Sequence, residues 1–277
     1  MDTLFAPYGR ATVGSSVHLR APMRVTVCQL HDEPDAFEAD WSALCAHTRR
    51  ERSELVLLLP EMPFGRWFAV TRPFDEHRWR AAIDAHRQWQ PRIAELDVAA
   101  VICTRPTERF DLRLNEAIVV TVDGAWSVHN KRYLPDEEGY WEASWYEPGD
   151  GVFEPFVAGR ATVGTQICTE MWMLDVSRQY GLRGVDIIAV PRVTPASSRE
   201  RWLVGGRAAA IVSGAFCVSS NRSGISTADD PFGGQGWIVD PDGDVLAVTS
   251  DAEPFATRDL NLARSVQAKG TYPRYVR

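Results

Sequence analysis

Short apolar runs alternate with amphipathic segments along the first half of the chain. Strand-like runs lie at 24–30 ("RVTVCQL"), 54–60 ("ELVLLLP") and 97–104 ("DVAAVICT"), and the intervening segments 35–51 and 75–95 have helical periodicity. A βαβαβ order of this kind predicts a parallel or mixed sheet whose outer face is covered by helices.

The second half continues the alternation and adds two hairpins. Two strand-like runs turn at Asp123-Gly124 and near Asp242-Gly243, where Asp-Gly pairs favour tight turns. Further strand-like runs lie at 160–168, 185–191 and 215–221, and helix-like segments lie at 174–182 and 198–213. No linker or change of composition separates the halves. We therefore predict one α/β domain in which two sheets face each other and helices cover both outer faces.

Composition and charge narrow the classes of function. The chain has 277 residues, of which 45% are hydrophobic, so it can bury a sizeable core. A formal net charge of -7 and a pI near 5.4 argue against nucleic acid or an anionic membrane as the partner. We expect a small-molecule substrate or a protein partner instead.

Residues 1–22 differ in character from the rest of the chain. They are rich in Gly, Ser and Ala and predict a flexible N-terminal arm, which leaves 23–277 as the folded domain. They contain no apolar run long enough for a signal peptide. No other part of the chain has the roughly 20 apolar residues that a membrane-spanning helix needs. The expected location is therefore the cytoplasm.

The cysteines do not form a recognisable framework. They are Cys28, Cys45, Cys103, Cys168 and Cys217. Their number is odd, they lie far apart, and none forms a C-x-x-C pair or lies near a histidine at zinc-ligand spacing. We predict neither a disulfide framework nor a metal site, and no cofactor.

Three chemically distinctive residues follow predicted strands. Glu61 follows "LVLLLP", Lys131 follows "AWSVHN" and Cys168 follows "ATVGTQI". Each has an ordinary interpretation as a solvated turn carboxylate, a surface ammonium or a small buried hydrophobe. Together they provide a base for a thiol, the thiol itself and a positive charge for the atom that becomes negative under attack. Because functional side chains gather beyond the carboxyl ends of strands, we expect these three to meet.

The surrounding sequence resembles the nitrilase, or carbon-nitrogen hydrolase, superfamily. "LLLPEMPFG", "HNKRYLPDEEGYWEASWYEPGD" and "GTQICTEMWMLDVSR" are similar to the three signatures that carry its Glu, Lys and Cys. "SSNRSG" and "FGGQGWIVDPDGDVLA" are similar to its closing stretches. The resemblance covers roughly residues 23 to 262.

The resemblance implies a four-layer αββα sandwich of two facing mixed sheets, assembled into homodimers or larger homo-oligomers. It implies that Glu61 is the general base, Lys131 the electrostatic partner and Cys168 the nucleophile. The backbone N–H of Thr169 would be an oxyanion donor. Glu142 would be a further catalytic carboxylate, because relatives that cleave carbamoyl amides place a Glu eleven residues after the Lys and soon after Gly-Tyr, as here.

The same resemblance favours an N-carbamoyl amine or aliphatic amide over a nitrile as substrate. The residues expected to bind the substrate are Tyr140, Glu170, Trp172 and Arg192. Arg192 lies in the loop beside the nucleophile and can grip a carboxylate, although an exposed loop cation is an equal interpretation. Two departures from the family pattern follow the nucleophile: Glu170 replaces an Asp, and Met-Leu-Asp at 173–175 replaces Phe-Pro-Glu.

Other classes of function stay open at this stage. His129 lies two residues before Lys131 and would share its face of a strand, so a Cys-His acyl-transfer enzyme is a second interpretation. A nitrilase or an N-acyltransferase of the same fold is a third. A non-catalytic oligomerising scaffold is a fourth, although the retained Glu, Lys and Cys argue against it.

Overall fold

The computed structural model describes residues 22–52, 54–56, 59–225 and 230–276. The predicted N-terminal arm lies outside the described residues except for Pro22. The described strands are β1 Met23–His31, β2 Leu55–Val56, β3 Ala100–Arg109, β4 Leu112–Thr121, β5 Gly124–Asn130, β6 Phe156–Ala158, β7 Ala161–Thr165, β8 Ile187–Arg192, β9 Phe216–Ser223, β10 Trp237–Val239, β11 Val245–Val248 and β12 Phe255–Leu260. The described α-helices are α1 Pro34–Glu51, α2 Glu76–Trp89, α3 Glu142–Trp145, α4 Leu174–Leu182, α5 Arg199–Ser213 and α6 Leu262–Ala268. Three 3₁₀ helices are η1 Gln90–Leu96, η2 Cys168–Trp172 and η3 Ala196–Ser198.

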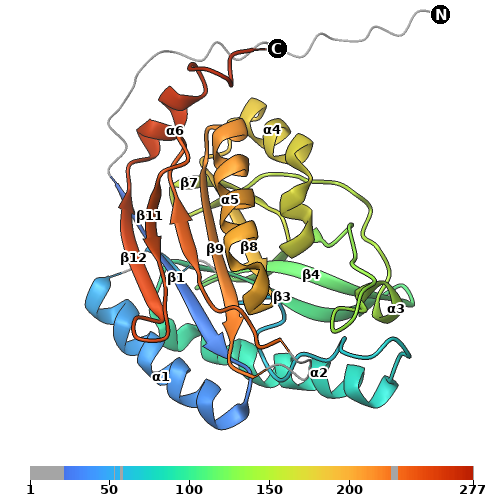
Figure 1. The fold of residues 1–277 in the computed structure, drawn as a ribbon. Helices are drawn as coiled ribbons and strands as arrows, with labels where there is room; N and C mark the ends of the chain where they lie inside the picture. The colour runs from blue at the N-terminus through green and yellow to red at the C-terminus, as the bar shows by residue number, and fades with distance from the viewer. Residues whose placement is uncertain (1–21, 53, 57–58, 226–229, 277) are drawn as a thin grey trace, which may run out of the picture.

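The strands form two mixed sheets that face each other. Their order is β5-β4-β3-β2-β1-β9-β8-β7-β6, with β12 beside β1 and the β10–β11 hairpin beside β9. The end of β1 pairs in parallel with β9 and joins the two sheets. Helices α1 and α2 cover one sheet, and α4 and α5 cover the other (Figure 1). The α/β prediction and the four-layer αββα sandwich are confirmed.

Alternation along the strands separates the inner core from the two outer cores. In β1, Val25 and Val27 point between the sheets, whereas Cys28 and Leu30 pack under α1. The same alternation in β8 and β9 divides their side chains between the inner core and the core beneath α4 and α5. Because both faces of these strands are buried, their sequences are nearly continuous apolar runs.

Most of the predicted elements are confirmed. Helices α1, α4 and α5 match the predicted helical segments within one residue at each end, and both Asp-Gly turns join antiparallel strands. The prediction of one continuous helix over 75–95 is wrong, because α2 ends at Trp89 and the chain continues as η1. Pro91 has no backbone N–H to donate to the carbonyl four residues earlier, which explains why the α-helical hydrogen bonding stops here.

None of the helices in the described part of the chain combines the length and apolarity that crossing a bilayer requires.

Close packing of α5 against β10 gives a test of the sandwich. A Cβ atom on Gly206 of α5 would lie 2.4 Å from the fully buried ring of Trp237. We expect Gly206→Ala to lower the free energy of unfolding by ~1–3 kcal/mol, because helix and strand must separate. Gly270→Ala is the matched control, since its Cβ would approach only the Gln267 carbonyl oxygen at 3.5 Å. Chemical denaturation measures both variants, and equal stabilities would contradict the packing described here.

Candidate active site

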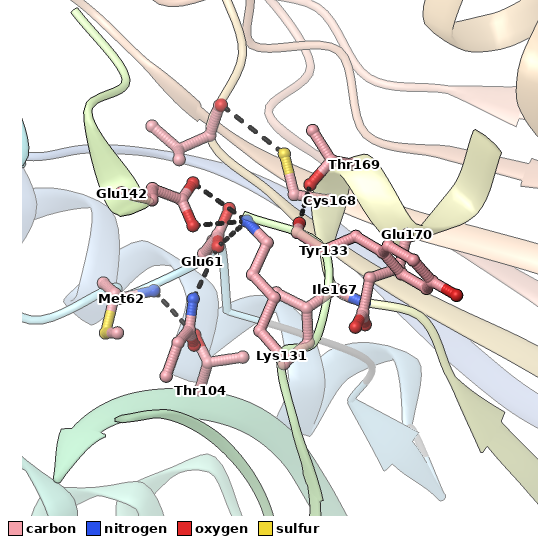
Figure 2. A network of polar contacts seen from close by, with 12 residues as sticks. Glu61, Met62, Thr104, Lys131, Tyr133, Glu142, Ile167, Cys168, Thr169 and Glu170 are labelled. Atoms are coloured by element: carbon pink, nitrogen blue, oxygen red, sulfur yellow. Dashed lines mark hydrogen bonds and ion pairs between the residues drawn. The ribbon is translucent and has the colours of Figure 1, made fainter. Parts of the chain in front are cut away.

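Three strand ends deliver the predicted catalytic side chains to one place. Glu61 lies beyond β2, Lys131 directly follows β5, and Cys168 lies three residues beyond β7. Glu142 begins the short helix α3. Figure 2 shows the four side chains converging, although they come from separate parts of the chain. The structure therefore brings together the residues that the sequence placed at strand ends.

The Lys131 ammonium lies between two carboxylates. Its Nζ donates to Glu61 Oε1 at 2.7 Å and to the two carboxylate oxygens of Glu142 at 2.8 and 2.7 Å. All three residues are fully buried. Burial opposes the positive charge, but the two carboxylates outweigh it and raise the pKa of Lys131. Burial and the charge of Glu61 raise the pKa of Glu142, whereas the charge and hydrogen bonds of Lys131 oppose this rise. Lys131 is therefore a permanent, immobile positive charge.

Glu61 is held so that one of its oxygens stays available. Asn115 Nδ2 donates to Oε1 at 2.7 Å, whereas the buried Oε2 accepts no hydrogen bond from the described residues. The buried guanidinium of Arg222 donates to the Glu61 carbonyl at 3.2 Å and also to the carbonyl of Met62. Met62 has a φ of 49°, and its N–H donates to Thr104 Oγ1 at 2.7 Å. An acceptor without a donor beside a thiol is suited to act as a base.

Cys168 has an unusual backbone conformation of the kind found at functional sites. Its φ is 50°, in the left-handed region that non-glycine residues rarely adopt and that is enriched at functional sites. The Sγ atom lies 3.7 Å from the Val193 carbonyl oxygen. Burial and the charge of Glu61 raise the pKa of the thiol, against the opposing effect of Lys131. The resting group thus keeps its proton and requires a base.

The other cysteines lack this environment. All five are buried, and none forms a disulfide bond. Cys28 and Cys103 lie within strands, where burial raises the pKa of each to about 12. Cys217 lies in β9 beneath α5, and burial raises its pKa as well. These three cysteines therefore behave as small buried hydrophobic residues of their strands. Cys168 differs from them because it lines a cavity.

A small cavity of about 270 Å³ opens beside Cys168. Its lining includes three further predicted residues, Tyr140, Thr169 and Trp172, together with Glu142. The buried Tyr140 hydroxyl has no hydrogen-bond partner among the described residues, and burial raises the pKa of the phenol, which keeps its proton. A protonated phenol without a partner can bind a polar group of a ligand.

Arg192 does not occupy the position expected of a substrate-binding residue. It is 1% exposed and is absent from the cavity lining. Its guanidinium donates to Ser219 Oγ at 2.6 Å, to Thr194 Oγ1 at 3.2 Å and to the Gln235 carbonyl at 2.7 Å. The interpretation of Arg192 as an exposed loop cation is wrong, because the side chain is buried and makes hydrogen bonds within the protein. Its contact with a substrate carboxylate stays a prediction.

The structure does not bring Glu170 to the cavity lining, where its predicted contact with substrate would place it. The residue is fully buried, and its carboxylate points away from Glu61 and Glu142 (Figure 2). It accepts hydrogen bonds from the backbone N–H groups of Arg132 and Ile167. It also contacts His129, whose side chain is 2% exposed and is not part of the cavity lining. The arrangement does not support His129 as the base for Cys168.

Sequence reasoning missed two residues that hold Glu61. Arg222 stands in the "SSNRSG" block, whose similarity to the family was the available signal, but nothing there indicated which carbonyl groups it binds. Asn115 lies in the middle of β4 and carried no local signal. Within the described ranges, no three His, Cys, Asp or Glu side chains are grouped to hold a metal ion.

Solved structures share this fold. A carbon-nitrogen hydrolase from Helicobacter pylori G27 superimposes with a TM-score of 0.77 at 20% identity, covering 91% of this chain and 94% of that one. A mutant amidase from Nesterenkonia sp. AN1 superimposes with a TM-score of 0.74 at 18% identity, covering 89% and 93%. That amidase carries the acetamide moiety of fluoroacetamide covalently added at its active-site cysteine.

Sequence comparison gives relatives with named activities. N-carbamoylputrescine amidase from Arabidopsis thaliana is 30% identical over 54% of this chain and 56% of its own length. Citrullinase from Francisella tularensis is 28% identical over 48% and 50%. The chain thus spans about half the length of the relatives it matches. The model of the carbon-nitrogen hydrolase family matches residues 24–269. The chain therefore belongs to the carbon-nitrogen hydrolase family.

Proposed function

We propose that the protein is a thiol-dependent hydrolase that cleaves a C–N bond of a small linear amide or N-carbamoyl amine. The observation that carries this proposal is the cluster of Glu61, Lys131 and Cys168 at the edge of a cavity of about 270 Å³. The relatives named for N-carbamoylputrescine and citrulline support a carbamoyl substrate, and the neighbouring amidase with a cysteine adduct supports a covalent mechanism.

The first half-reaction forms a thioester. Glu61 takes the proton of Cys168 through its free Oε2, and the sulfur forms a bond to the substrate carbonyl carbon. The carbonyl π electrons move to oxygen, where Lys131 and the Thr169 N–H stabilise the negative charge. Glu61 then returns the proton to the departing nitrogen as the C–N bond breaks. Ammonia or an amine leaves, and the acyl group stays on sulfur.

Water completes the cycle by the reverse sequence of proton transfers. Glu61 removes a proton from water as the oxygen attacks the thioester carbon, and the C–S bond breaks when the tetrahedral intermediate collapses. The thiolate regains the proton from Glu61. Glu142 keeps the Lys131 ammonium in position throughout, because both of its oxygens accept from Nζ. One carboxylate thus serves as base twice and as acid twice, with no other proton carrier.

The cavity supports a short substrate. Thr169 and Trp172 line it next to the nucleophile, and Tyr140 offers an unpaired hydroxyl. Cys168 and Glu142 both contribute to the same lining, so a carbonyl group that reaches the sulfur also lies near the Lys131 cluster. A nitrile hydrolase or an N-acyltransferase of the same fold would use the same cluster. Product analysis with nitriles, and with an added amine acceptor, distinguishes them from an amidase.

Assembly and location form part of the proposal. Large apolar side chains stay exposed on the outer helices, at Leu182 of α4 and Val204 of α5, which supports a homodimer or larger homo-oligomer through a helical face. Five buried thiols that form no disulfide bond support the cytoplasm, a reducing compartment, as the location. Light scattering coupled to size exclusion measures the assembly, and a monomer at micromolar concentration would contradict it.

The nucleophile is tested by mass and rate together. Rapidly quenched enzyme should show a covalent adduct on Cys168 by intact-mass analysis, and Cys168→Ala should lose at least ~10³-fold in turnover. Cys45→Ala is the control, because Cys45 lies on α1 away from the cavity. An unchanged rate for Cys168→Ala would refute the thiol mechanism, whereas wild-type protein without activity on any amide or carbamoyl amine would favour a non-catalytic scaffold.

Lys131→Arg tests whether the reaction needs the small ammonium group of lysine. Arg keeps a positive charge, but its planar fork is too large for the fully buried site between two carboxylates. We expect the variant to lose ~10²-fold or more in kcat/KM, because the charge no longer lies at the oxyanion. Lys269→Arg replaces the only other lysine and should keep its activity. Ammonia release measures both, after circular dichroism confirms folding. Equal rates for the two variants would refute the role of Lys131.

Tyr140→Phe tests the unpaired hydroxyl. If substrate supplies the missing partner of Tyr140, removing the oxygen should raise KM about 3- to 10-fold and leave kcat nearly unchanged. Tyr133→Phe is the matched control, since Tyr133 is 41% exposed and does not line the cavity. Steady-state kinetics on a panel of amides and carbamoyl amines gives both constants. A KM that does not change for any substrate would remove Tyr140 from the binding site.

A further inference from the structure

A buried charged pair that the reaction does not use lies behind the catalytic residues. The side chains of Glu170 and His129 are 0% and 2% exposed. His129 Nε2 lies 2.8 Å from Glu170 Oε2 and 3.0 Å from Oε1. Burying a carboxylate costs several kcal/mol unless charge and hydrogen bonds compensate, so a pair at this depth requires a structural reason.

The carboxylate of Glu170 connects the two catalytic segments. Oε1 accepts from the Arg132 N–H at 2.6 Å, and Oε2 accepts from the Ile167 N–H at 2.7 Å. Arg132 directly follows Lys131, and Ile167 directly precedes Cys168. A single side chain thus fixes the backbone next to the ammonium and the backbone next to the nucleophile. The Ile167 bond alone would cap η2, but the Arg132 bond serves no capping purpose.

The hydrogen bonds of His129 define its charge. Nδ1 lies 3.1 Å from the Val152 carbonyl oxygen, and Nε2 faces the Glu170 carboxylate. Both partners can only accept, so both ring nitrogens must donate, and the ring is an imidazolium. The other neighbours are the Phe153 ring at 4.5 Å and the negative charge of Asp150. Burial lowers the pKa of His129, but the charge and hydrogen bond of Glu170 outweigh it and raise the pKa.

We propose that the His129–Glu170 pair is the positioning element that sets the Lys131 ammonium relative to the Cys168 sulfur. Charged His129 orients the Glu170 carboxylate, and this carboxylate holds the ends of β5 and β7 together. Neither residue touches the substrate. The inference rests on the proposed function, because it assigns a purpose to the distance between Lys131 and Cys168.

The titration of His129 follows from its raised pKa. A group whose pKa is higher in the folded protein contributes stability that is fully present below its ordinary value, near 6.5 for histidine. This contribution disappears as pH rises through the folded pKa. The positioning should therefore be complete in mildly acidic solution and weaken on the alkaline side of 6.5.

The first test replaces each partner with a neutral side chain of similar shape. Glu170→Gln loses one of two acceptors and its charge, and we expect kcat to fall ~10- to 100-fold with KM nearly unchanged, because a small displacement of catalytic groups has this effect. His129→Gln keeps a donor toward Glu170 but has no titratable proton. Its kcat should be a few-fold lower near pH 6 and should lack the part of the alkaline decline that the wild type owes to His129.

The second test measures the protonation state of His129 in the absence of substrate. Selective ¹⁵N labelling of the six histidines, with His129 assigned by its absence in His129→Gln, should show both ring nitrogens of His129 protonated at pH 6.5. A neutral ring at that pH would overturn the proposal.

The kinetic outcomes separate the two proposals. If Cys168→Ala is inactive but Glu170→Gln and His129→Gln both keep the wild-type kcat and pH profile, the positioning role is wrong and the proposed function stands. If Cys168→Ala is fully active, the proposed function fails, and with it any reason for the pair to set this distance. A purely structural role would lower the melting temperature of both variants while kcat per folded molecule stays unchanged, and that result also overturns the inference.

Discussion

The burial of one ammonium group between two carboxylates is the constraint on which the rest of the site depends. Lys131 has no exposure to water, and an unpaired charge at that depth would cost several kcal/mol. Glu61 and Glu142 supply the compensation at 2.7 to 2.8 Å. These residues lie 70 and 11 positions from the lysine. The protein can therefore bury this charge only when three distant segments of the chain have docked correctly.

The surrounding structure fixes these segments through their backbones. Arg222 binds carbonyl groups around Glu61, and Glu170 binds N–H groups beside Lys131 and Cys168. The nucleophile Cys168 has a positive φ, a conformation that costs free energy and persists only where the surroundings enforce it. Rigid support of this kind is what a reaction needs when its groups must meet within a fraction of an ångström.

The three buried glutamates of the site differ in the groups that they contact. Glu61 Oε2 accepts no hydrogen bond from the described residues, whereas both oxygens of Glu142 accept from the Lys131 ammonium. Glu170 is paired with His129 away from the cavity. Three buried carboxylates close to one nucleophile thus have three separate purposes. Their partners, more than their burial, distinguish them, since all three are fully buried.

The order of strands and helices, the layered fold and the meeting of Glu61, Lys131 and Cys168 followed from the sequence. Periodicity decides which face of a strand or helix is buried, and strand ends gather at one edge of a sheet. Only the tertiary structure decided which groups the long polar side chains bind. Arg192 meets Ser219 and Gln235, which lie 27 and 43 residues away, and Glu170 meets Arg132 across 38 residues. Local pattern cannot indicate such partners, because they come from strands and loops whose positions are set only when the two sheets pack together.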